Sequence, residues 1–143
     1  MSKFNGTWED REIDPSYEPF MDAIGLGEYK EKYKGASSTA TYEVNGDKWK
    51  ITWLTSMYPD NPMTYEIEVG KPFDTQGPDG SDVKSTLTVI SDCETKEHEI
   101  TNAEDGKNRE FIIIRKVNGD IMEYTIEAVA SKATMKGKMY RKK

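Results

Sequence analysis

Hydrophobic residues follow two different periods along this chain. Up to Gly35 they recur at helical spacing, and the apolar residues of segment 16–24 fall on one side of a short helix that Ser16 can cap. Glycines end this helix, and a second short helix is predicted from about Glu28 to Lys34. The first part of the chain therefore predicts a helical hairpin.

After Gly35 apolar and polar residues alternate with a period of two, and turn residues separate the alternating runs. The predicted strands lie around Trp8 and over residues 39–44, 48–55, 63–69, 84–91, 95–101, 109–117, 120–127 and 133–141. This pattern indicates about ten strands joined by short turns. Such a meander is antiparallel, and closing it into a barrel removes the exposed edges that would otherwise aggregate.

Two Asn-Gly pairs, at residues 45–46 and 118–119, are strong hairpin signals. With the first pair as the turn, one face of its hairpin is apolar and holds Ala40, Tyr42, Val44, Trp49, Ile51 and Trp53. With the second pair as the turn, Arg115 lies beside Met122, Ile113 beside Tyr124, and Phe111 beside Ile126. This second set is more apolar than its opposite face, so we expect it to point inward, and it contains Arg115.

An inward-facing arginine requires an explanation, because a guanidinium removed from water without partners is costly and cannot lose its proton. One interpretation is that Arg115 binds the carboxylate of a ligand, directly or through water. The alternatives are that it reaches solvent near a strand end or pairs with a buried glutamate. A turn that differs by one residue would place Ile114 inside instead.

The last predicted strand adds a second candidate. Lys138 and Tyr140 share one of its faces and could offer an ammonium and a phenol to the same carboxylate. Neither face of this strand is cleanly apolar, so an exposed basic C-terminus explains the pattern equally well.

Composition narrows the function. The 143 residues carry a formal net charge of −6, which argues against a general nucleic-acid binder. Cys93 is the single cysteine and His98 the single histidine, and His98 lies on a strongly polar predicted strand, so the sequence indicates no enzyme and no metal site. The chain has no signal-peptide pattern and no apolar run that could span a bilayer, and a cytoplasmic location is expected.

Five segments, in order, resemble the intracellular lipid-binding proteins, the family of fatty-acid-binding and cellular retinoid-binding proteins. Phe4-Asn5-Gly6-Thr7-Trp8 is similar to the family's opening F-x-G-x-W, and segment 16–27 is similar to its first helix. The other matching segments are 44–47, 70–74 and 82–85. The resemblance covers essentially the whole chain.

This resemblance implies a single domain over residues 1–143: an all-β, ten-stranded antiparallel up-and-down β-barrel (β-clam) capped by a helix-turn-helix. It implies non-covalent binding and intracellular transport of a hydrophobic ligand, above all a long-chain fatty acid, with no cofactor. Family members hold the ligand carboxylate with an arginine on the eighth strand and an R-x-Y pair on the last. Arg115 matches the first, and Lys138 with Tyr140 matches the pair with lysine in place of arginine. A further family arginine corresponds to Ser81 here.

The expected cavity and portal residues are Tyr17, Met21, Trp53, Met57, Ile113 and Tyr124. A monomer is expected, with transient contact to anionic membranes through Lys30, Lys32 and Lys34 unless neighbouring glutamates balance these lysines. Two other functions stay open. The ligand could be a retinoid, a sterol-like molecule or a tetrapyrrole, or the barrel could serve protein interaction or protection with a vestigial cavity.

Overall fold

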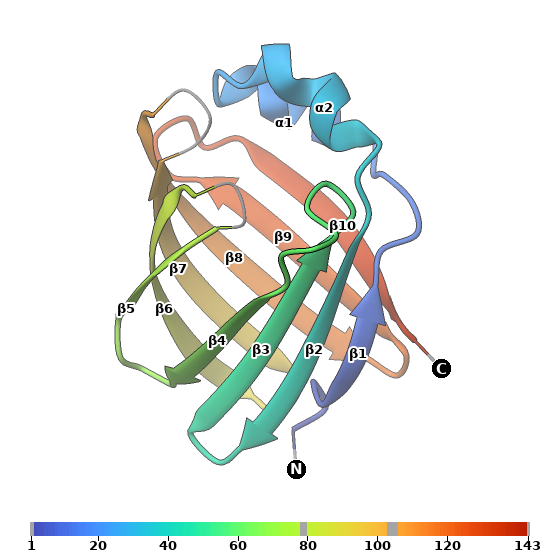
Figure 1. Cartoon of the computed structure of the whole chain (residues 1–143), viewed down its shortest axis with the longest axis vertical. Helices are drawn as coiled ribbons and strands as arrows, with labels where there is room; N and C mark the ends of the chain where they lie inside the picture. The colour runs from blue at the N-terminus through green and yellow to red at the C-terminus, as the bar shows by residue number, and fades with distance from the viewer. Residues whose placement is uncertain (1, 78–79, 103–105, 143) are drawn as a thin grey trace.

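The computed structural model describes residues 2–77, 80–102 and 106–142. Within these ranges ten strands form one antiparallel sheet in the order β4-β3-β2-β1-β10-β9-β8-β7-β6-β5, which curls into a nearly closed barrel (Figure 1). The strands are β1 (Gly6–Glu9), β2 (Ser38–Asn45), β3 (Lys48–Thr55), β4 (Met63–Glu68), β5 (Phe73–Gln76), β6 (Asp82–Ser91), β7 (Glu94–Asn102), β8 (Asn108–Asn118), β9 (Ile121–Ala128) and β10 (Thr134–Arg141). The predicted fold class is confirmed.

The chain ends meet in this sheet, because β1 pairs with β10 through Trp8 opposite Arg141. The two edges of the sheet, β4 and β5, come from the middle of the chain. β5 is only four residues long and lies in a stretch that the sequence pattern assigned to turns. A strand this short shows too little alternation to be recognised.

The helical cap lies across one end of the barrel (Figure 1) and consists of α1 (Tyr17–Ala23), a 3-10 turn (Gly27–Tyr29) and α2 (Lys30–Lys34). Ser16 occupies the position before α1 but makes no capping hydrogen bond with its side chain. Its hydroxyl instead donates to Asp14 at 2.6 Å and accepts from the backbone N–H of Lys136 at 2.9 Å. Arg109 donates to the carbonyl of Ile24 at 2.8 Å, so both β8 and β10 hold the cap in place.

No helix in the described ranges has the length and apolar character needed to cross a bilayer.

Both predicted hairpins form, but each turn lies one residue later than the Asn-Gly pair. Asn118 pairs with Ile121, and the loop residues are Gly119, with a φ of +63°, and Asp120. Glycine adopts this left-handed conformation without strain. The predicted neighbours on β8 and β9 were therefore wrong: Arg115 pairs with Tyr124 rather than with Met122.

The same displacement shifts every pair on these two strands. Ile113 lies opposite Ile126, and Phe111 lies opposite Ala128. Because each residue's partner moves by two positions, all side chains keep the face that was predicted for them. Arg115, and not Ile114, is the residue that lines the barrel interior.

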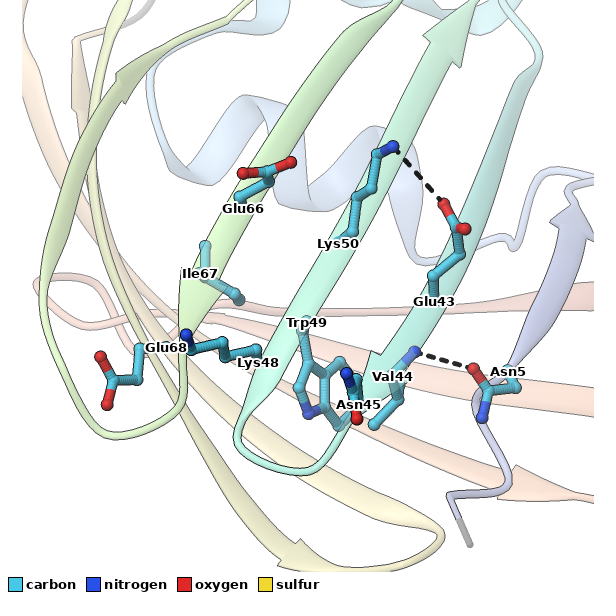
Figure 2. Close-up of a pocket in the computed structure, with 10 residues that line it drawn as sticks. All are labelled: Asn5, Glu43, Val44, Asn45, Lys48, Trp49, Lys50, Glu66, Ile67 and Glu68. Carbon is cyan, nitrogen blue, oxygen red and sulfur yellow. Dashed lines mark hydrogen bonds and ion pairs between the residues drawn. The ribbon is translucent and has the colours of Figure 1, made fainter.

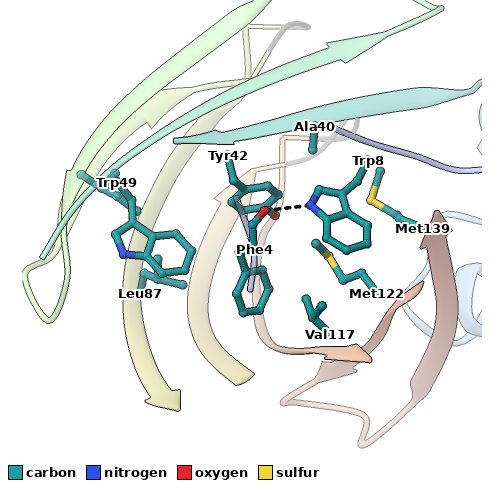
Figure 3. Packing of buried hydrophobic residues seen from close by; sticks show 10 residues of the cluster. Phe4, Trp8, Ala40, Tyr42, Trp49, Leu87, Val117, Met122 and Met139 are labelled. Atoms are coloured by element: carbon teal, nitrogen blue, oxygen red, sulfur yellow. Dashed lines mark hydrogen bonds between the residues drawn. The ribbon is translucent and has the colours of Figure 1, made fainter. Parts of the chain in front are cut away.

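The hydrophobic core fills the end of the barrel opposite the cap, where Trp8, Phe4 and Met122 are fully buried (Figure 3). The indole N–H of Trp8 donates to the carbonyl of Phe4 at 2.9 Å. The guanidinium of Arg141 lies 4.2 Å from the centre of the Trp8 ring. The core therefore closes one end of the barrel, and the space that remains lies between this core and the helical cap.

Candidate functional site

A cavity of about 280 Å³ lies inside the barrel next to the core. Its walls are mostly aromatic and aliphatic, with a polar side formed by β6, β7 and β8. The lining residues are Tyr42, Trp49, Ile51, Trp53, Tyr65, Ile67, Phe73, Thr75, Val83, Ser85, Leu87, Thr95, Glu97, Glu99 and Arg115. An apolar cavity with a few convergent polar groups is the usual form of a site for a small hydrophobic ligand.

A second cavity of about 430 Å³ adjoins the first and extends beneath the cap. The two share Trp53, Val83 and Glu99 as wall residues. The two cavities are therefore neighbours, and we call the second one, which lies under the cap, the access cavity.

Four of the six predicted cavity and portal residues line this space. They are Tyr17, Trp53, Met57 and Tyr124. Tyr17 also donates its hydroxyl to the carbonyl of Lys30 at 2.8 Å, which joins the two helices of the cap. Met21 and Ile113 are buried but line neither cavity.

Arg115 points into the barrel, where a glutamate on the neighbouring strand already binds it. Its Nη1 lies 2.6 Å from Oε1 of Glu97, and less than a fifth of either side chain is exposed. The second carboxylate oxygen of Glu97 accepts from the hydroxyl of Ser85 at 2.7 Å. Both oxygens of Glu97 are thus satisfied, and the guanidinium has the buried partner that its charge requires.

Glu99 lies two residues further along the same face of β7 and adds a second buried carboxyl group. Burial, followed by the negative charge of Glu97, raises the pKa of Glu99 to about 7. Burial alone would lower the pKa of Arg115, but Tyr42 and the hydrogen-bonded Glu97 outweigh it and raise that pKa. Burial also raises the pKa of the Tyr42 phenol and of the Tyr124 phenol. We call Arg115, Glu97 and Glu99 the interior charge cluster.

The raised pKa of Glu99 predicts that the protein loses stability as the pH rises. Between its ordinary pKa of 4.5 and about 7, the folded state keeps a proton that the unfolded state has released. The free energy of unfolding should therefore fall by up to about 3 kcal/mol over this range, relative to a Glu99→Gln variant that cannot titrate there. Urea denaturation of both proteins at pH 5 and pH 8 measures the difference, and equal pH dependence in the two would contradict it.

Lys138 and Tyr140 are not brought to Arg115. Lys138 is exposed on the outer face of β10. The Tyr140 hydroxyl donates to the carboxylate of Glu12, and the guanidinium of Arg11 lies 4.6 Å from the centre of its ring. The three residues predicted to hold a ligand carboxylate therefore do not meet in this structure, and only Arg115 lines the cavity.

The orientation of β10 has a local cause. Gly137 lies opposite Tyr124, and a Cβ atom at position 137 would overlap the Tyr124 ring. The aromatic ring thus occupies the space that a side chain would need, and this fixes residues 137 and 139 on the inner face. Lys138 and Tyr140 consequently point outward, since successive side chains on a strand alternate.

A wider hollow of about 560 Å³ lies on the outside of the barrel beside the hairpin of β2 and β3 (Figure 2). Exposed charged side chains dominate its rim, among them Lys48, Lys50 and Glu66. Lys50 and Glu43 form an ion pair at 4.0 Å across it. This charged surface does not suit a hydrophobic ligand, so the interior cavity is the better candidate despite its smaller volume.

Sequence reasoning missed Glu97 and Glu99. Both faces of β7 are polar, with Lys96 and His98 on the outside, so alternation could not show which face points inward. A signal did exist, because an inward-facing Arg115 required a buried partner, and β7 is the strand that pairs with its own. His98 lies outside as expected and bonds to Glu110.

These features define a capped antiparallel barrel whose interior holds a mostly apolar cavity with a charged side.

No family model matches the chain. It is 32% identical over 88 residues to fatty acid-binding protein homolog 5 of Caenorhabditis elegans, a match over 61% of this chain and 62% of that protein, so the match spans about three fifths of the relative's length. It is 29% identical over 128 residues to a fatty acid-binding protein of Schistosoma japonicum, covering 88% of this chain and 89% of that one.

Solved structures share the fold of this chain. The Schistosoma mansoni fatty acid binding protein in complex with arachidonic acid has a TM-score of 0.77 and 22% identity, covering 100% of this chain and 98% of that one. Secretory abundant heat soluble protein 4 of Ramazzottius varieornatus has a TM-score of 0.80 and 18% identity, covering 100% and 97%. The resemblance to the intracellular lipid-binding proteins is confirmed. Since proteins with different names share this fold, the fold alone does not select the function.

Proposed function

We propose that this protein binds one long-chain fatty acid non-covalently inside its barrel and carries it within the cell. The observation that supports this best is the mostly apolar interior cavity, which has Arg115 on its polar side and shares three wall residues with the access cavity. Relatives that match along most of the chain are named fatty acid-binding proteins. An alkyl chain would lie against the aromatic walls, where burial of each methylene group contributes about 0.8 kcal/mol.

The proposal includes a carrier without catalytic activity that works as a cytoplasmic monomer, with residues 1–143 as one lipid-binding domain. The described walls of both cavities contain neither histidine nor cysteine.

Membrane contact through α2 stays a prediction. Two of its three lysines form ion pairs within the cap, Lys30 with Asp22 at 3.0 Å and Lys34 with Glu18 at 3.1 Å, and a membrane would have to compete with these pairs.

Binding inside the barrel can be tested by placing a large side chain where the two cavities adjoin. Val83 lines both cavities, so Val83→Trp should occlude the space between them and weaken a fluorescent fatty-acid analogue by at least about tenfold. Thr88→Trp, on the exposed face of the same strand, is the matched control and should bind like the unmodified protein. The measurement is titration of delipidated protein, with displacement of the analogue by oleic acid.

Two results would contradict the proposal. If delipidated protein shows no displaceable binding, it is not a fatty-acid carrier. If Val83→Trp binds as tightly as the control while remaining folded by circular dichroism, the ligand lies elsewhere.

A further inference from the structure

A ligand carboxylate that enters the interior cavity finds the charge of Arg115 already paired. Glu97 binds the guanidinium at 2.6 Å through one oxygen and is held through the other by Ser85 at 2.7 Å. A carboxylate that enters the cavity must either displace Glu97 from these contacts or become an additional buried anion. Neither is favourable, because a buried charge without a partner is strongly destabilising.

The charges that face this cavity can be counted from each strand around it. Among the described residues that line the interior cavity, Arg115 on β8 is the one cation, and Glu97 and Glu99 on β7 contribute two carboxyl groups. The other titratable groups on the described wall of this cavity are the phenols of Tyr42 on β2 and Tyr65 on β4, and the access cavity adds the phenols of Tyr17, Tyr33, Tyr58 and Tyr124. One cation balances one carboxylate, so the empty cavity is neutral when Glu99 is protonated.

The charged residues among the described walls of the access cavity are predominantly acidic. Its charged wall residues are Asp10, Glu12, Asp14, Glu99 and Lys136, four acidic groups and one basic group. A fatty-acid anion moving from the cap towards Arg115 therefore meets a predominantly negative lining. Such a lining disfavours anions and favours neutral head groups.

We propose that the interior charge cluster makes this cavity selective for head groups that bring no net charge, so that a fatty acid is bound together with one proton. A fatty alcohol of the same chain length is bound without one. This inference rests on the proposed function, since it concerns the form in which the same cavity accepts its ligand. Glu97 is the specificity-determining residue because it neutralises the arginine before the ligand arrives.

A definite pH dependence follows. A fatty acid in water is ionised well above pH 5, as other carboxylic acids are. If the complex holds one more proton than the separated protein and ligand, affinity falls as the pH rises, by about tenfold per pH unit. A fatty alcohol gains no proton when it binds, so its affinity lacks this tenfold change per pH unit.

The test compares oleic acid with oleyl alcohol on the same delipidated protein. Trp49 and Trp53 line the cavity, so intrinsic tryptophan fluorescence reports binding directly, and calorimetry in phosphate and Tris buffers counts the protons taken up. Between pH 6 and pH 8 the Kd of oleic acid should rise by about a hundredfold or more, with about one proton or more bound per ligand. The Kd of oleyl alcohol should change far less over the same range.

A variant pair identifies the responsible residue. Glu97→Gln removes the anion that occupies Arg115, so oleate can bind there as an anion and the pH dependence of its Kd should largely disappear. Glu66→Gln, exposed on the outer face of β4, is the matched control and should keep the steep dependence. If Glu97→Gln fails to fold, the proton count on the unmodified protein still decides the question.

The possible failures are distinct. An oleic acid Kd that stays constant from pH 6 to pH 8, with no proton taken up, overturns the inference and leaves the proposed function standing. A steep dependence that persists unchanged in folded Glu97→Gln overturns the role of Glu97. Failure of both ligands to bind at every pH overturns the proposed function, and the inference with it.

Discussion

Replacing Glu97 with leucine is expected to lower the free energy of unfolding by about 3–5 kcal/mol. The substitution leaves the Arg115 guanidinium inside the barrel without its partner at 2.6 Å. An arginine cannot escape by losing its proton, so its charge stays buried, and Glu99 is the carboxyl group of the interior charge cluster that is left to balance it. Arg115→Met should cost less, because Glu97 can take up a proton once the cation is gone.

The double variant Glu97→Leu with Arg115→Met separates these costs from simple loss of packing. Replacing both members of a buried ion pair with apolar residues of similar size is often neutral or stabilising. We therefore expect the double variant to recover most of the stability that Glu97→Leu loses. Urea denaturation of all four proteins gives the coupling energy between the two positions. If the two single effects simply add, the pair does not stabilise the barrel in the way its geometry indicates.

The second large effect is expected at Trp8, which is fully buried in the core that closes the barrel. Trp8→Ala removes the largest buried side chain together with its hydrogen bond to the Phe4 carbonyl and its contact with Arg141. Substitutions of this kind cost about 3–5 kcal/mol. For a chain of this size that corresponds to a fall in Tm of roughly 10 °C, measurable by calorimetry.

Trp53 provides the matched control, because it is only partly buried and lines the cavities rather than the core. Trp53→Ala should lower Tm much less and should change ligand binding instead. Equal losses of stability for the two substitutions would show that the core and the cavity wall are not energetically distinct.

The alternation of residues predicted the barrel, its hairpins and the inward direction of Arg115, because β2, β3, β8 and β9 each have one clearly apolar face. The prediction failed where both faces of a strand are polar. On β7 it gave no orientation for Glu97, and on β10 it could not exclude an inward Lys138. On β10 the inner face is marked by Gly137, which the Tyr124 ring covers, and by the buried Met139, and a pattern of polarity does not contain such cross-strand contacts.

Arg115 illustrates the same limit at the site itself. Its inward direction followed from the pattern, but the choice between a ligand carboxylate and a buried glutamate depended on which residue of β7 lies within reach. The register between β7 and β8 decides which residue this is. Thr95 lies directly opposite Arg115, and Glu97 is the next residue on the same face of β7. The charge of Arg115 therefore has to be considered together with those of Glu97 and Glu99.

The sheet order has a consequence for how the chain is connected. Within the described residues, the pairing of β1 with β10 is the only one between strands that are distant in sequence, and the two unpaired edges lie at β4 and β5. A circularly permuted chain that begins at β5, passes from β10 into β1 through a short linker and ends at β4 would pair every strand with its immediate neighbour in sequence. Such a chain would have a lower contact order than the natural one, and lower contact order is associated with faster folding. The natural order instead makes completion of the sheet depend on β10, which is synthesised after the other nine strands.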